Sequence, residues 1–196
     1  MKRLRSNAGY SLIEIMVVMA VMGIIAAFAI PVVASTSSSI KLRGQAEDLS
    51  NLVGLAKMRA TARFSRARVF VDQAARTFVL QIWDDDAKKW VDDNASTTLP
   101  FGITFGFGKV DEPPPDTQEE IKFAAECTND AGDEMEKTSC INFNSRGIPI
   151  DSDGVPVGGN AFYLTDGTGV RGITVTATPL IRDWWSSASD AGWVRQ

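Results

Sequence analysis

The feature that most constrains this chain is a long apolar stretch near its N-terminus, preceded by a single acidic residue. From Ile15 to Ala34 the sequence has no charged side chain, and about 20 apolar residues suffice to cross a bilayer as a helix. Glu14 stands directly before this stretch. An ionised side chain in hydrocarbon is costly and normally has a partner or a function. The segment therefore predicts a membrane helix whose acidic residue has a specific role.

A short basic leader precedes the apolar stretch. It contains Lys2, Arg3 and Arg5 and no acidic residue. Positive residues before a span predict that the N-terminus stays in the cytoplasm and that the rest of the chain is exported. The whole chain has a net charge of -4, and it becomes more acidic without the leader. An acidic exported domain is not expected to bind nucleic acid in general.

Gly9, Tyr10, Glu14 and Pro31 together resemble the class III signal peptide of type IV pilins and of type II secretion pseudopilins. The resemblance implies that prepilin peptidase cleaves between Gly9 and Tyr10. It also implies N-methylation of Tyr10, where the family normally has Phe, an assembly contact at Glu14 and a helix kink at Pro31. The implied organisation is a leader peptide (1–9), a transmembrane and assembly helix (10–34), an amphipathic helix (35–66) and a periplasmic β-rich domain (67–196).

Three other interpretations of the N-terminal segment remain open. An ordinary secretory signal could be cleaved after Ala29, because Ala27 and Ala29 suit the usual peptidase. The segment could also be an uncleaved membrane anchor that takes no part in assembly. Finally, Glu14 could be hydrated at the membrane surface without any specific partner. Pro31 lies two residues past the cut that an ordinary secretory signal would need, which argues against that interpretation.

The absence of histidine removes several chemistries at once. With no histidine in the chain, a Ser-His-Asp or Cys-His arrangement cannot form, and neither can a histidine-based zinc or iron site. An EF-hand-like loop starting at Asp151 would need an acid where Phe162 stands, so Asp151–Gly154 is predicted to be a turn. We therefore expect no catalytic residue, no metal and no cofactor.

Cys127 and Cys140 are the only cysteines. An oxidising compartment permits a disulfide between them. The bond would close a short polar loop and stabilise the domain by about 3 kcal/mol in the chain-entropy estimate. Two unpaired thiols are the alternative. The spacing matches no metal or redox motif.

Hydrophobic periodicity predicts that the N-terminal helix continues well beyond the apolar stretch. A helix from about Ser11 to Phe64 is expected, because apolar residues recur at helical spacing in its second half. From Ala67 the period changes to two, which is typical of strands. One long helix followed by antiparallel strands predicts an α+β domain. The residues of the expected apolar face are Ala46, Leu49, Val53, Ala56 and Ala60.

Several strands are expected after the helix. A hairpin with its turn at 73–76 should come first, followed by a polar connection at 84–94 in which Trp90 folds back onto the domain. The segment 110–120 should be a loop, because three successive prolines cannot supply ladder hydrogen bonds. The expected strands are 68–72, 77–83, 99–107, 121–124, 141–144, 161–165 and 172–177.

Phe143 and Gly147, followed by the strand near 172–177, resemble the C-terminal half of H-type pseudopilins and FimT-like minor pilins. FimT-like proteins linked to DNA uptake usually carry a Gly-Arg pair and further basic residues after the last strand. At that place this chain offers only Arg182, so DNA is not an expected partner. One basic cluster, expected to be a solvated face, consists of Lys57, Arg59, Arg63, Arg66 and Arg68.

These features predict a structural subunit and not an enzyme. The resemblance implies a minor pseudopilin that is processed by prepilin peptidase and assembled with other pilin or pseudopilin subunits by an inner-membrane platform. It further implies a single-pass inner-membrane protein with its C-terminal domain in the periplasm. The alternative is a minor type IV pilin that acts in pilus biogenesis or DNA uptake. An exported β domain on a plain membrane anchor is a third hypothesis.

Overall fold

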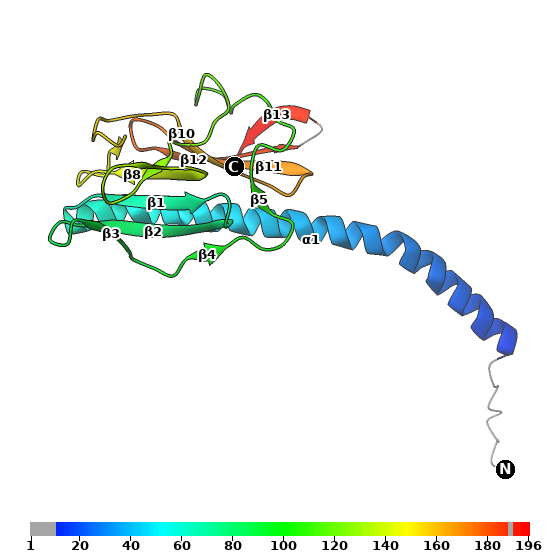
Figure 1. Ribbon diagram of the computed structural model, residues 1–196. Helices are drawn as coiled ribbons and strands as arrows, with labels where there is room; N and C mark the ends of the chain where they lie inside the picture. Colours follow the sequence, from blue (N-terminus) through cyan, green and yellow to red (C-terminus); the bar gives the residue numbers. More distant parts are fainter. Residues whose placement is uncertain (1–10, 188–189) are drawn as a thin grey trace, which may run out of the picture. The chain divides into compact units, whose positions relative to one another are not determined.

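The computed structural model describes residues 11–187 and 190–196, and its dominant element is one long helix (Figure 1). Helix α1 runs over Leu12–Arg63, which confirms the helix expected from Ser11 to Phe64. The chain divides into two compact units between Ser37 and Ser38. The first unit holds the N-terminal part of α1, and the second holds the rest of α1 together with all the described strands.

Two antiparallel sheets make up most of the second unit. Sheet A has the order β3-β2-β1-β8-β9, with β4 paired to β2, and sheet B has the order β13-β12-β11-β10-β5. A third, two-stranded sheet joins β6 and β7. The α+β class expected from the sequence is therefore confirmed. The strands are β1 (Ala67–Asp72), β2 (Thr77–Asp84), β3 (Lys89–Asp92), β4 (Thr97–Thr98), β5 (Thr104–Phe105), β6 (Cys127–Thr128), β7 (Glu134–Met135), β8 (Thr138–Phe143), β9 (Pro149–Ile150), β10 (Asn160–Thr165), β11 (Gly169–Val175), β12 (Ile181–Ser187) and β13 (Asp190–Arg195).

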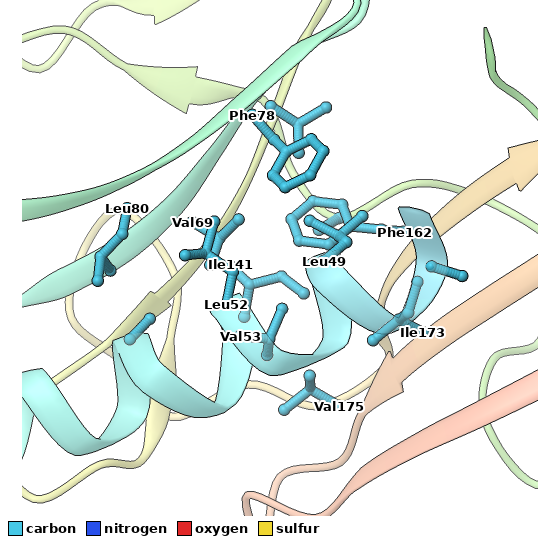
Figure 2. Packing of buried hydrophobic residues seen from close by; sticks show 14 of the residues in the cluster. Leu49, Leu52, Val53, Val69, Phe78, Leu80, Ile141, Phe162, Ile173 and Val175 are labelled. Atoms are coloured by element: carbon cyan, nitrogen blue, oxygen red, sulfur yellow. The ribbon is translucent and has the colours of Figure 1, made fainter. Parts of the chain in front are cut away.

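The second half of α1 is packed between the two sheets. Figure 2 shows Leu49 and Val53 of the helix among side chains that come from sheet A and from sheet B. All five residues of the expected apolar face are buried, which confirms that expectation. Apolar side chains on both sides of a helix require cover on both sides. The sheet residues labelled around the helix are Val69, Phe78, Leu80, Ile141, Phe162, Ile173 and Val175.

Three of the expected β segments were wrong in detail. Within the segment 99–107 only β5 (Thr104–Phe105) forms a strand, and it belongs to sheet B. The segment 121–124 forms no strand, although the Ala124 amide donates to the Ala161 carbonyl at 2.8 Å. The polar connection 84–94 contains β3, in which Trp90 does pack on Trp83 as expected, with ring centroids 5.3 Å apart. Short pairings of this kind depend on distant partners that local periodicity does not report.

The disulfide joins β8 to the small β6–β7 sheet. Cys127 and Cys140 are bonded, with their Cα atoms 5.0 Å apart. The Cys140 amide also donates to the Ala125 carbonyl at 2.9 Å. The loop closed by the bond is polar and contributes little to the core. The covalent link therefore holds a segment that has few apolar contacts of its own.

Candidate functional site

The described N-terminal part of α1 is an apolar helix with exposed side chains. Large apolar side chains from Leu12 to Ile25 are exposed on every side of the helix, with Leu12 at 78% and Ile25 at 62%. A helix that is apolar all round requires lipid or other protein chains around it. This segment can therefore act as an assembly surface or an anchor.

Glu14 lies in the first turn of α1 and its side chain is exposed. Its backbone amide donates to the Ser11 carbonyl at 3.0 Å, and the Ile15 amide donates to the same oxygen at 3.2 Å. A carboxylate near a helix N-terminus interacts favourably with the helix dipole by about 0.3–1 kcal/mol. The position of Glu14 thus suits helix initiation as well as contact with another subunit.

The other N-terminal site residues lie largely outside the described part. Gly9 and Tyr10 belong to residues 1–10, which are not described. Pro31 lies within α1, but its side chain is not described, so the helix kink stays a prediction. Cleavage after Gly9 and methylation of Tyr10 likewise stay predictions.

Among the residues whose placement is described, no helix has both the length and the hydropathy of a membrane span. The expected span 10–34 includes Tyr10 and the side chains of 28–34, which lie outside that description. The span therefore stays a prediction.

The expected solvated basic face is largely engaged within the second unit. Arg59 and Arg63 both form ion pairs with Asp93, each with an N–O distance of 2.9 Å, and the Asp93 side chain is only 10% exposed. Lys57 donates through Nζ to the Pro179 carbonyl at 3.1 Å. These contacts join the end of α1 to the segment that follows β3 and to the turn that precedes β12.

The expectation of a solvated basic face is wrong for Arg68, because only 3% of this residue is exposed. Its Nε donates to Gln81 Oε1 at 2.8 Å and its Nη1 donates to the Thr128 carbonyl at 2.7 Å. The guanidinium lies 3.9 Å from the centre of the Trp90 ring. Burial lowers the pKa of Arg68 from 12.5 to about 10, against an opposing effect of Asp130. Alternation in β1 and β2 is the signal that places Arg68, Gln81 and Trp83 on one face. The segment whose Thr128 carbonyl accepts from Arg68 comes from far along the chain.

The C-terminal aromatic and basic residues belong mainly to sheet B. Trp184 is 7% exposed and donates through Nε1 to Thr174 Oγ1 at 2.9 Å. Trp193 donates through Nε1 to the Glu112 carbonyl at 2.8 Å. Arg182 is half-buried, and its Nε is a buried atom without a hydrogen-bond partner. The two tryptophans are therefore held by hydrogen bonds within the second unit, and Arg182 is not freely solvated.

The turn expected at Asp151 is present. Asp151 Oδ1 accepts hydrogen bonds from the amides of Asp153 and Val155, at 3.0 and 2.8 Å. Gly154 has a φ of +83°, which suits a turn. Within the described ranges, no three Asp, Glu or Cys side chains come together in a way that could hold a metal ion.

Phe143 and Gly147 have distinct structural roles. Phe143 is fully buried in the core. Gly147 has a φ of +72°, and a Cβ at this position would lie 3.1 Å from Thr61 Cγ2 and 3.2 Å from Lys57 Cγ. Glycine therefore allows the β8–β9 turn to approach the end of α1 closely.

Comparison with known proteins identifies the class of the N-terminal segment. The prokaryotic N-terminal methylation motif matches residues 4–30. The chain is therefore type IV pilin-like in this segment. Proteins of that class are structural subunits, which agrees with the expectation that the chain is not an enzyme.

Two solved structures of a minor pseudopilin, EpsH, from the type 2 secretion system of Vibrio cholerae are similar to this chain. In one, the TM-score is 0.46 with 14% identity, over 76% of this chain and 99% of the EpsH chain. In the other, the TM-score is 0.44 with 16% identity, over 73% and 92%. No curated protein gave a significant sequence match.

Proposed function

We propose that this chain is a minor, H-type subunit of a type II secretion pseudopilus. Prepilin peptidase cleaves it between Gly9 and Tyr10 and methylates Tyr10. The mature subunit is held in the inner membrane by one helix, with its β-rich domain in the periplasm. The observation that carries this proposal is the methylation motif over residues 4–30 on a helix that is apolar on all sides.

The apolar helix supplies a physical reason for assembly. Its exposed side chains are covered by lipid before assembly, and neighbouring helices replace that lipid in a filament. Association of helices in a membrane depends on close packing and favours small or flexible side chains. Ala20 and Gly23 are small, and Met16, Met19 and Met22 are flexible. These residues permit close contact with helices of other pilin or pseudopilin subunits.

Glu14 sets the register between subunits in this proposal. Its carboxylate pairs with the free α-amino group of Tyr10 of an adjacent subunit, which offsets the cost of burying either charge alone. A contact that repeats head to tail builds a helical polymer. An inner-membrane assembly platform supplies the subunits.

Replacing Glu14 with alanine tests this role. We expect Glu14→Ala to leave membrane insertion and helix content intact but to reduce incorporation into filaments at least about tenfold, because loss of a buried charge partner costs several kcal/mol. Incorporation is measured by the amount of subunit in sheared filaments. Asp48→Ala, which removes an exposed acid elsewhere on α1, is the matched control. Normal incorporation of Glu14→Ala would contradict the assigned role.

No contact of the basic side chains specifically supports the alternative, a minor type IV pilin that acts in DNA uptake. The cationic side chains it would need are largely paired or stacked within the second unit, as described for Arg59, Arg63 and Arg68. We expect no salt-dependent retardation of duplex DNA by the full chain in detergent. Retardation that is lost in Arg182→Ala would favour the DNA-uptake alternative.

A further inference from the structure

Phe101 is an aromatic side chain that the second unit leaves almost entirely uncovered. It lies in the connection between β4 and β5, and 94% of it is exposed. Of the large apolar side chains that the structure describes, it is the most exposed. Single exposed apolar side chains are common on protein surfaces. The position of Phe101 in the second unit therefore decides whether it has a partner.

The backbone around Phe101 is fixed on both sides. The Ile103 amide donates to the Pro100 carbonyl at 3.1 Å, which closes a four-residue turn with Phe101 at its tip. Gly102 follows with a φ of +89°, as such a turn requires. Leu99 and Ile103 are only 2% and 1% exposed, and they anchor the turn in the core. The turn therefore holds Phe101 at the surface.

The turn lies at the end of the second unit at which α1 enters it. Strand β5 begins at Thr104, which pairs with Thr165 of β10. The next residue, Asp166, accepts a hydrogen bond from Ser38 Oγ at 2.8 Å. Ser38 is the first residue of the second unit. Figure 1 shows the connection from β4 to β5 beside α1 at this end of the sheets.

The predicted membrane span ends close to the same point of the chain. The span is expected to reach Ala34, and Ser38 follows four residues later. Four residues extend over at most about 14 Å. The end of the second unit that carries Phe101 therefore stays near the lipid surface in any orientation of that unit.

Two neighbouring side chains of α1 suit contact with lipid. Ile40 is 66% exposed and Lys41 is also exposed, whereas Leu42 is buried. Apolar side chains enter the boundary between headgroups and acyl chains, and a lysine beside them can reach lipid phosphates. Because the covalent link keeps lipid nearby, a membrane surface is favoured over another protein as the partner of this end.

We propose that Phe101 and Ile40 insert into the headgroup region of the membrane that holds the N-terminal helix, with Lys41 against lipid phosphates. This inference rests on the proposed membrane-held subunit and adds a second, reversible membrane contact to it. The contact limits the orientations of the second unit before assembly. It is lost when the helix leaves the lipid for a filament.

Spin labels on the full chain in phospholipid vesicles test the contact. Both native cysteines form the disulfide, so an introduced cysteine is the only free thiol. We expect a label on Phe101→Cys to be accessible to oxygen and shielded from a water-soluble nickel complex. Phe64→Cys is the matched control, because Phe64 is 84% exposed and lies about 39 Å further along α1 than Ser38 at 1.5 Å per residue. Its label should be accessible to the nickel complex.

A third label, on Met19→Cys, separates this inference from the proposed function. A label in lipid at position 19 together with a water-exposed label at position 101 would overturn the membrane contact alone. A water-exposed label at position 19 would overturn the proposed membrane helix and this inference with it.

Phe101→Ser tests the aromatic side chain itself, in a chain labelled on Ile40→Cys. Because Phe101 is 94% exposed, this change should not alter urea unfolding in detergent. We expect it to lower the ratio of membrane-bound to free second units at least about tenfold, seen as higher nickel accessibility at position 40. Phe64→Ser in the same labelled chain should have no such effect. Equal accessibility in the two variants would overturn the role of Phe101.

Discussion

Gly147 allows the β8–β9 turn to pack closely against the end of α1. Its left-handed backbone and the nearness of Thr61 and Lys57 both exclude a side chain. Gly154 also has a left-handed backbone, at a φ of +83°, but nothing lies within 4 Å of the Cβ position. The two glycines therefore separate the conformational cost of alanine from its steric cost.

We expect Gly147→Ala to be the more destabilising of the two substitutions. Gly154→Ala should lower the free energy of unfolding by about 1 kcal/mol, the cost of a left-handed alanine. Gly147→Ala should lower it by about 1–3 kcal/mol more, because the methyl group also displaces α1 side chains. Urea unfolding of both variants measures the difference. Equal losses would show that α1 and the turn are not in close contact.

The buried Tyr163 should make the stability of the fold depend on pH. Burial raises the pKa of Tyr163 well above its usual value of about 10, and its hydroxyl donates to Gln118 Oε1 at 2.8 Å. The neutral phenol therefore stabilises the fold below pH 10, and this contribution is lost as the pH rises above 10.

Tyr163→Phe should be about 1 kcal/mol less stable than the unmodified chain at pH 8, because one hydrogen bond is lost. As the pH rises toward 11, the difference should shrink, since only the unmodified chain has a Tyr163 proton to lose on unfolding. Urea unfolding across this range gives the measurement. A difference that stays constant with pH would contradict the raised pKa.

The burial of Arg68 could not be predicted from its neighbours in the sequence. A cluster of basic residues predicts a solvated face, but Arg68 is buried under a segment that lies 60 positions further along the chain. The same limit applies to Phe101, whose place in the second unit depends on the pairing of β5 with β10. The N-terminal methylation motif could be matched over residues 4–30 because it is linear, whereas the roles of Gly9, Tyr10, Glu14 and Pro31 stay predictions.

At the scale of elements, the sequence predicts the long helix and the larger hairpins well. Helix α1 and strands β1, β2, β8, β10 and β11 have strong periodicity. Strands β6, β7 and β9 have two residues each, and their pairing depends on the disulfide and on turns. Strands β12 and β13 were missed because tryptophan, serine and aspartate in that region mix strand and loop preferences.

The disulfide should be the main stabiliser of the β6–β7 sheet. Replacing Cys127 and Cys140 together with serine should lower the free energy of unfolding by about 3 kcal/mol, since the bond closes a loop between residues 13 positions apart. Urea unfolding of the oxidised chain and of the double variant tests this. Unchanged stability in the double variant would mean that the loop is already ordered without the bond.

At the scale of the whole molecule, the chain combines an apolar helical segment, exposed at residues 12–25, with an α+β unit. The second unit buries its own core, and Asp93 pairs with Arg59 and Arg63 of α1. The large apolar side chains described from Leu12 to Ile25 are exposed, and a helix that is apolar all round requires lipid or other protein chains around it. This difference between the two units favours the proposed subunit, whose N-terminal helix takes part in assembly.

The measurement that tests the central claim most directly is the mass of the N-terminal peptide after expression with a prepilin peptidase. The proposal predicts a mature chain that begins at Tyr10 and carries one N-terminal methyl group. The same measurement on Gly9→Ala serves as a control, and there the leader should be retained. An intact Met1 in the unmodified chain, or a chain that begins after Ala29, would contradict a pilin-like subunit.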